Sequence, residues 1–260
     1  MELSENQVPK NIKGKTAIVT GGSRGIGAAI VKELIDDGCN VIINHRRNVG
    51  KGAAQVKQLI KYAEEKGVHA CNVLGDLSVR RDVEKMFKNL QNDFQQIDHL
   101  ILNAGQTPFK EFQEFNKEDW KILLNTNLIG NVGCVQGVLP MMQEGGSIVF
   151  ITSTGSRRVM PHYPMGVIKA ALEHLVRYLD FELHSKGIRV NGVCGGLVKT
   201  DTFEQLEQVW PGFMQMLEIR KRDFVLDPSE IASVVSFLCS DKSRAIQGSV
   251  ILADRGITLE

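Results

Sequence analysis

The chain alternates between short apolar runs and longer amphipathic segments, and this alternation limits the available folds more than any other feature. The apolar runs are rich in β-branched residues, which favour strands. Strands that are apolar on both faces and are each followed by a helix are typical of a parallel sheet covered on both sides. The predicted strands are Thr16–Thr20, Asn40–Asn44, His69–Leu74, His99–Asn103, Ser147–Ile151, Ile188–Cys194 and Ser249–Ala253. The predicted helices are Ala28–Asp37, Gly52–Lys66, Val79–Phe94, about Lys117–Met142, about Pro164–Ser185 and one that begins near Pro228.

This order of elements predicts an α/β fold, in the form of one doubly wound Rossmann-type domain. Its seven-stranded parallel sheet is expected to be flanked by helices on both faces. The strand–helix units and an insertion at about 200–226 fill the 260 residues, so we expect a single domain over 13–260 and a flexible N-terminal lead-in at 1–12. Ligands of such sheets bind beyond the carboxyl ends of the strands, so the chemistry is expected in the strand-to-helix loops.

Charge and cysteine content argue against several function classes. Lys plus Arg total 31 and Asp plus Glu total 30, and the net charge of +1 argues against nucleic acid or an anionic membrane as the main partner. The five cysteines are widely spaced and form no CxxC pair, so neither a metal site nor a disulfide framework is expected. The N-terminus has no apolar signal core, and we expect no apolar stretch of membrane-spanning length. These features predict a cytoplasmic protein.

A glycine-rich loop follows the first predicted strand and opens the first predicted helix. Glycines let the backbone turn tightly and approach a ligand, while the helix N-terminus offers free N–H groups and a positive dipole end to a pyrophosphate. An ordinary tight turn is the alternative, but the flanking strand and helix favour a dinucleotide. The loop residues expected to contact it are Gly21, Ser23, Arg24, Gly25, Ile26 and Gly27.

The end of the second predicted strand distinguishes the two nicotinamide cofactors. A site for NAD usually has an acidic residue there, which binds the ribose hydroxyls. This chain instead has His45, Arg46 and Arg47 after Asn44. Together with Arg24, these basic residues suit the 2′-phosphate of NADP(H). A solvated basic turn is the alternative, and the missing carboxylate favours NADPH/NADP+.

Taken in order, the motifs resemble the short-chain dehydrogenase/reductase family from about Gly14 to the end of the chain. The glycine loop matches the TGxxxGxG motif of that family. The resemblance implies cofactor contacts from Asp76, Leu77, Asn103, Ala104, Gly105, Lys169, Gly196, Val198 and Thr200. It implies catalytic roles for Asn127, Ser153 and Lys169, and it implies a homodimer or homotetramer.

Three positions depart from the family pattern. Gly195 stands where proline is usual, and Arg255 interrupts the C-terminal Asp-Gly-Gly motif. The catalytic YxxxK pair is also broken, because Met165 stands four residues before Lys169 and the nearest tyrosine, Tyr163, stands six before it. Residues four apart share a face of a helix, so a lysine can lower the pKa of a tyrosine there. Residues six apart in a continuous helix are separated by about 240° around the axis.

Pro164 offers a way for Tyr163 and Lys169 to cooperate. Proline favours the first position of a helix and keeps the preceding residue out of helical geometry, so Tyr163 is expected in the incoming loop, from which its ring can turn toward Lys169. The alternative role for Tyr163 is a wall of the substrate pocket. His162 is a less favoured replacement acid, and we prefer to interpret it as an exposed loop residue.

Two reactions and a third class of function stay open. The stretch from Tyr163 to Leu172 and the pair Gly195-Gly196 resemble type III enoyl-acyl-carrier-protein reductases, in which the tyrosine is displaced. Ser153 and Asn127 instead resemble carbonyl reductases, in which the serine donates a hydrogen bond to the substrate oxygen and the asparagine anchors a water. A strand-end hydroxyl and a helix-kink residue are the structural alternatives. We place reduction of a 3-oxoacyl-like ketone or conjugated carbonyl ahead of enoyl-thioester reduction, and a catalytically weakened NADPH sensor is the third class.

The insertion at about 200–226 is expected to be a substrate lid for an apolar or acyl-like substrate, free or carrier-bound. Packing of its side chains into the core is the alternative. Its apolar residues are Phe203, Leu206, Val209, Trp210, Phe213, Met214, Met216 and Leu217. Five basic residues are candidates for binding a carrier phosphate or carboxylate, with solvated charge as the alternative: Arg157, Arg158, Arg220, Lys221 and Arg222.

Overall fold

The computed structural model describes residues 12–209, 215 and 223–259. Within these residues the chain forms a seven-stranded sheet in the order β3-β2-β1-β4-β5-β6-β9, and every neighbouring pair is parallel. The predicted doubly wound sheet is therefore confirmed. The strands are β1 (Thr16–Val19), β2 (Asn40–His45), β3 (Ala70–Leu74), β4 (His99–Leu102), β5 (Ser147–Ser153), β6 (Arg189–Gly195) and β9 (Val250–Ala253).

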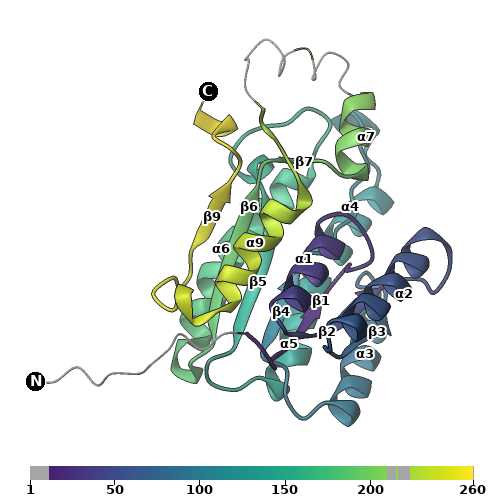
Figure 1. Cartoon of the computed structure of the whole chain (residues 1–260). Coiled ribbons are helices and arrows are strands. Elements are labelled where there is room, and N and C mark those ends of the chain that lie inside the picture. Colours follow the sequence, from purple (N-terminus) through teal and green to yellow (C-terminus); the bar gives the residue numbers. More distant parts are fainter. Residues whose placement is uncertain (1–11, 210–214, 216–222, 260) are drawn as a thin grey trace, which may run out of the picture.

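Helices cover both faces of this sheet (Figure 1). One layer consists of α1 (Gly25–Asp36), α2 (Gly50–Glu65) and α9 (Pro228–Cys239). The opposite layer consists of α3 (Arg80–Asp93), α5 (Gly130–Val138) and α6 (Met165–Leu183). The two core clusters divide by strand alternation: Val149 and Ile151 of β5 pack in the first, and Ile148 and Phe150 pack in the second. Burial on both faces explains why the strands are continuously apolar in sequence.

The long helical stretch predicted at about Lys117–Met142 is interrupted by a wider turn. It consists of α4 (Lys117–Leu124), a π-helical segment at Asn125–Ile129, α5 and a short 3₁₀ turn at Leu139–Met141. Contrary to our expectation from the sequence, Lys117–Met141 is long and apolar enough to cross a membrane by length and composition alone, with a mean hydropathy of 1.3 over its most apolar window. Part of its apolar surface packs against α3 and the sheet, and Leu123 packs against α6, while Leu124 and Ile129 are exposed.

A small second sheet was not predicted. It pairs β7 (Leu197–Val198) with β8 (Val225–Leu226) on either side of the insertion, whose described part includes the helix α7 (Asp201–Val209). The apolar lid residues from Trp210 to Leu217 and the basic residues from Arg220 to Arg222 lie outside the described residues. So does the predicted lead-in, except for its last residue. Ile12 is only 2% exposed and packs in the core, so the expectation of a flexible segment is wrong at that residue.

Candidate active site

A cleft of about 740 Å³ lies at the carboxyl ends of the central strands. Its lining includes all of the residues that the sequence predicted to bind the cofactor, from the glycine loop to Thr200. Three of the four predicted catalytic side chains also line it, namely Ser153, Tyr163 and Lys169. The fourth, Asn127, is fully buried and is not among the lining residues. Motifs spread over most of the chain are therefore brought to one cavity.

The glycine loop packs too closely for any side chain. A Cβ on Gly27 would lie 2.3 Å from the carbonyl oxygen of Gly21, and one on Gly21, where φ is 62°, would lie 2.9 Å from the Cα of Ala104. The Asn103 amide fixes the loop by donating to the carbonyl oxygens of Thr20 (3.0 Å) and Gly21 (3.2 Å). Helix α1 begins at Gly25 with no capping side chain from the described residues and no acidic residue in its first turn. Its free N–H groups fit a pyrophosphate.

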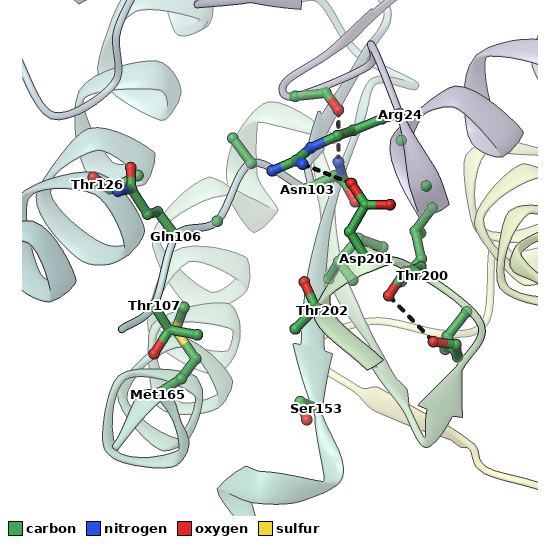
Figure 2. A pocket seen from close by; sticks show the side chains of 18 of the residues that line it. Arg24, Asn103, Gln106, Thr107, Thr126, Ser153, Met165, Thr200, Asp201 and Thr202 are labelled. Atoms are coloured by element: carbon green, nitrogen blue, oxygen red, sulfur yellow. Dashed lines mark hydrogen bonds and ion pairs between the residues drawn. The ribbon is translucent and has the colours of Figure 1, made fainter. Parts of the chain in front are cut away.

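Two arginines stand at the mouth of the cleft. The Arg24 guanidinium forms a 2.7 Å ion pair with Asp201 at the start of α7 (Figure 2). Arg46 donates to the side-chain oxygen of Gln106 (3.0 Å) and lies 3.9 Å from the Asp76 carboxylate. Both arginines are exposed, although Asp76 is half-buried, and ion pairs of exposed side chains exchange readily for a stronger partner. The side chains are thus available to a phosphate.

Arg47 and His45, the other two basic residues at the end of β2, differ in burial. Arg47 is exposed at the end of β2. The His45 ring is buried, with Nδ1 3.0 Å from the Arg47 carbonyl oxygen and Nε2 3.2 Å from the Asn72 amide nitrogen. His45 therefore shapes the turn that presents the arginines.

Asn44 is a functional residue that the sequence reasoning missed, because it was considered only as the place where an acid is absent. Its amide oxygen accepts from the backbone N–H of Gly21 (3.4 Å), and its amide nitrogen donates to the carbonyl oxygen of Gly75 (3.3 Å). It therefore ties the glycine loop to the turn that leads to Asp76. A buried polar residue at the end of a parallel strand was the available signal.

Tyr163 lies in the loop before α6, as Pro164 predicted, because α6 begins at Met165. The Tyr163 ring packs on Gly155, where a Cβ would lie only 2.8 Å from the ring, and it stacks on Phe109 with 5.7 Å between ring centroids. Burial raises the pKa of the Tyr163 phenol, and a side-chain hydrogen bond from Ser153 opposes that rise. Ser153, at the end of β5, also accepts from the backbone N–H of Gly155 (3.2 Å). A tyrosine six residues before the lysine thus reaches the serine.

Lys169 is almost completely buried, with 8% of its surface exposed. Its ammonium donates to the carbonyl oxygen of Ile151 (2.6 Å), which lies two residues before Ser153 in β5. Burial lowers the pKa of Lys169 to about 8. The ammonium is therefore held at the carboxyl end of β5 and titrates near neutral pH.

Met165 and His162 are the other two residues near Tyr163 that the sequence analysis considered. Met165 occupies the helical position four before Lys169, is buried, and lines the cleft, as Thr107 does (Figure 2). His162 is half-buried rather than exposed, so our preferred interpretation of it was wrong in that respect. It has a positive φ of 57° and is not among the residues that line the cleft.

Asn127 lies in the π-helical segment, and its side chain bonds to backbone on both sides. Its amide oxygen accepts from the Gln106 N–H (2.9 Å), and its amide nitrogen donates to the carbonyl oxygens of Gln106 (2.8 Å) and Leu123 (2.9 Å). Its own carbonyl oxygen accepts from the Asn131 amide (2.7 Å). Asn127 thereby clamps the loop after Gly105, which forms one wall of the cleft.

Comparison with known proteins identifies the family. A protein-family model described as enoyl-(acyl carrier protein) reductase matches residues 21–258. The 3-oxoacyl-[acyl-carrier-protein] reductase FabG of Staphylococcus epidermidis is 32% identical over 246 residues, which cover 94% of this chain and 98% of that protein. The chain belongs to the short-chain dehydrogenase/reductase family. Its resemblance to that family, and the oxidoreductase class that the resemblance implied, are confirmed.

Two further proteins are similar over nearly the whole chain. The 1-cyclohexenylcarbonyl-CoA reductase of Streptomyces collinus is 30% identical over 251 residues, covering 94% of this chain and 87% of that protein. The angucycline C-6 ketoreductase LanV, solved with bound NADP, has a TM-score of 0.86 and 31% identity, covering 96% of this chain and 98% of that one. The family includes relatives with both of the reaction types considered above.

Proposed function

We propose that this chain is an NADPH-dependent reductase that acts on the ketone of an apolar, 3-oxoacyl-like substrate, free or carrier-bound. The observation that carries the proposal is that Ser153, Tyr163 and Lys169 line the same cleft as the residues expected to bind the cofactor. A serine hydroxyl beside a protonated phenol offers two donors to one oxygen, as carbonyl reduction requires. The names of the relatives FabG and LanV support this reaction type.

The cleft fits NADPH, which supplies the hydride when bound. The closely packed glycine loop and the free N–H groups of α1 suit its pyrophosphate. Arg24 and Arg46 suit the 2′-phosphate, because both guanidinium groups are exposed and because no acidic residue ends β2. LanV was solved with NADP bound, which supports the same choice.

In the proposed reaction, the C=O π bond breaks as the carbonyl carbon is reduced, and the developing oxyanion takes a proton. Ser153 donates a hydrogen bond to that oxygen, and the Tyr163 phenol transfers its proton to it. Burial keeps the phenol protonated before the reaction. Lys169, held by the Ile151 carbonyl, supplies positive charge that favours the phenolate left behind. Asn127 holds the Gln106 loop in place at the edge of the cleft.

The substrate side of the cleft is apolar. Its side chains come from three segments that are distant in sequence, namely the loop after β4, the loop before α6, and β7 with α7. They are Phe109, Met160, Met165, Leu197, Phe203 and Leu206. Such a wall favours an acyl chain or a ring system over a sugar or a charged metabolite.

Reduction of an enoyl thioester is the second candidate, and the position of Tyr163 favours it. Met165 occupies the helical position next to Lys169, so the phenol reaches the cleft from the loop. In conjugate reduction the hydride goes to the β-carbon while the tyrosine still serves the carbonyl oxygen, so a displaced tyrosine suits that geometry. The matching family description and the 1-cyclohexenylcarbonyl-CoA reductase support this candidate.

A matched pair of substrates separates the two reactions. The purified chain is incubated with NADPH and either a 3-oxoacyl or a 2-enoyl thioester of the same acyl chain and carrier, and the loss of NADPH absorbance is followed. Turnover of the 3-oxoacyl compound is expected, and turnover of the enoyl compound alone would reverse the assignment. NADPH binding without turnover of either compound, or of a wider carbonyl panel, would favour the sensor class.

We also propose that the chain forms a homodimer or homotetramer. Three large apolar side chains on α6, Val167, Tyr178 and Phe181, are between 54% and 80% exposed. Apolar surface of this kind on a regular helix suits a second copy of the chain. Light scattering of the purified protein tests the proposal, and a monomer at micromolar concentration would contradict it. The cytoplasmic location expected from the sequence stays a prediction.

A further inference from the structure

Arg255 interrupts the C-terminal Asp-Gly-Gly motif, and its backbone shows why the interruption is unusual. Its φ is 49°, in the left-handed region that glycine adopts without strain. Among the described residues the only other non-glycine with a positive φ is His162. An arginine at a position suited to glycine implies that its side chain makes contacts that offset the strain.

The Arg255 side chain is held by two carboxylates and by two backbone carbonyl oxygens, those of Asp223 (3.4 Å) and Val225. Its Nε donates to Glu230 Oε1 (3.1 Å) and its Nη2 to Glu230 Oε2 (2.7 Å), which makes a bidentate pair. Its Nη1 donates to Asp223 Oδ2 (2.5 Å) and to the carbonyl oxygen of Val225 (3.0 Å). The planar guanidinium can satisfy this set of acceptors together, whereas a lysine ammonium cannot reproduce the bidentate pair.

These contacts join three segments at Arg255. Asp223 and Val225 belong to the strand that returns from the insertion and forms β8. Glu230 lies in the first turn of α9, where it also accepts from the backbone N–H of Asp227. Arg255 itself follows β9. The guanidinium therefore fixes the returning strand to α9 and to the end of the sheet.

The returning strand is continuous with the wall of the cleft. In the β7–β8 pair, Leu197 is opposite Val225 and Val198 is opposite Leu226. Leu197 and Val198 line the cleft. Phe224, which is 1% exposed, packs in one cluster with Leu197 and with Leu206 of α7. A shift of β8 therefore moves the apolar wall directly.

The turn that carries Arg255 is itself rigid and touches the cleft. The Asp254 carboxylate accepts from the backbone N–H groups of Gly256 (2.9 Å) and Thr258 (3.0 Å). Gly196, which lines the cleft, packs flat on this turn, and a Cβ on Gly196 would lie 2.8 Å from the Cα of Asp254. The guanidinium thus projects from a fixed point beside the site.

We propose that Arg255 is a positioning residue that sets the apolar, substrate-side wall of the cleft by clamping β8 to α9 and to the C-terminal turn. It governs the affinity for the apolar part of the substrate and leaves the chemical step to Ser153, Tyr163 and Lys169. The part of this proposal that concerns substrate rests on the proposed reductase function. The clamp itself does not depend on that function.

Arg255→Gly is the decisive variant, because glycine tolerates a φ of 49° and the substitution removes only the clamp. We expect the KM for the apolar ketone to rise ~10-fold, as for loss of a charge-assisted hydrogen-bond set, with kcat and the Kd for NADPH within about twofold of wild type. The KM of Arg255→Lys is expected to lie between those of the wild type and Arg255→Gly. The matched control is Arg80→Ala, which removes an exposed arginine–glutamate pair outside the residues that line the cleft and is expected to leave the KM unchanged.

Amide hydrogen exchange tests the clamp without any substrate. The N–H of Lys199 donates to the carbonyl oxygen of Leu226 and reports directly on the contact between the two strands (3.0 Å). Peptides covering 197–200 and 223–227 are expected to exchange faster in Arg255→Gly, while peptides of β5 are unchanged. Unchanged exchange would refute the clamp. Faster exchange with an unchanged KM would refute the role of Arg255 in substrate affinity. If kcat and NADPH affinity fell as much as substrate affinity, Arg255 would contribute to general stability instead. If the wild-type protein reduces no ketone, the proposed function is refuted, but the clamp itself is not.

Discussion

Tyr163→Phe tests the role of the displaced tyrosine with little disturbance of the fold. Phenylalanine keeps the ring that packs on Gly155 and stacks on Phe109, and it removes only the hydroxyl that is hydrogen-bonded to Ser153. Ser153 retains its bond from the Gly155 N–H. The structural cost is therefore that of one hydrogen bond, about 0.5–1.5 kcal/mol of unfolding free energy.

The catalytic cost is expected to be much larger. A positioned general acid contributes ~10²–10⁴-fold to the rate, which corresponds to about 2.7–5.5 kcal/mol of activation free energy. We expect kcat to fall by that factor, the Kd for NADPH to change by less than about threefold, and the unfolding midpoint to move by a few degrees at most. Steady-state loss of NADPH absorbance at saturating substrate measures kcat, NADPH fluorescence titration measures the Kd, and thermal unfolding measures the midpoint.

Two further variants make the result decisive. Tyr178→Phe removes the hydroxyl of a 54% exposed tyrosine on the same helix as Lys169 and is expected to leave kcat unchanged. Tyr163→Phe combined with Met165→Tyr restores a tyrosine four residues before Lys169 and is expected to recover part of the lost rate. If Tyr163→Phe has wild-type kcat, the phenol is not the proton donor, and Tyr163 is a wall of the substrate pocket.

Three other predictions follow from the geometry of the cleft. The value of kcat/KM for reduction is expected to fall as the pH rises through about 8, because Lys169, with its pKa lowered to about 8 by burial, is cationic below that pH and neutral above it; the falling limb is expected to be absent from the pH profile of Lys169→Met. Arg24→Ala is expected to weaken NADPH binding ~10–100-fold with little effect on NADH binding, as loss of a charge-assisted hydrogen bond implies. Asp201→Asn frees Arg24 from its exposed ion pair and is expected to tighten NADPH binding by up to ~5-fold. Equal effects on the binding of both cofactors would contradict the assignment of Arg24 to the 2′-phosphate. Gly27→Ala places a Cβ 2.3 Å from the Gly21 carbonyl oxygen, so NADPH binding is expected to weaken by more than ~10-fold while circular dichroism stays native; a wild-type Kd for NADPH would contradict the importance of the close packing.

Much of the fold and the cofactor cleft could be predicted because their signals are local. The strand runs are continuously apolar, since both faces of the sheet are covered, and this pattern survives in the linear sequence. The glycine loop can be recognised in the sequence because its glycines stand where a Cβ would clash with neighbouring atoms. Pro164 placed Tyr163 outside the helix, because the effect of proline on its predecessor is a property of two adjacent residues.

The features that could not be predicted depend on contacts between distant residues. Asp201 pairs with Arg24 across 177 positions, and no local pattern links them. The β7–β8 pair has two residues in each strand, which is too short for an alternation pattern. The π-helical segment around Asn127 differs from an α-helix by a single extra residue per turn, so ordinary helix periodicity runs through it. Such features are set by tertiary packing rather than by propensity.

The displaced tyrosine depends on two glycines as well as on the proline. The Tyr163 ring occupies the space where a side chain of Gly155 would stand, and Gly155 in turn packs against Gly166, where a Cβ would lie 2.3 Å from the Gly155 carbonyl oxygen. The close contact between these glycines brings the loop before α6 against the end of β5, which is what allows the phenol to reach Ser153. The spacing to the lysine is thus a poor guide to whether a tyrosine lies in the cleft with Ser153 when the loop can approach the strand. A glycine two residues after the serine and another directly inside the helix form the pattern that such a displacement requires.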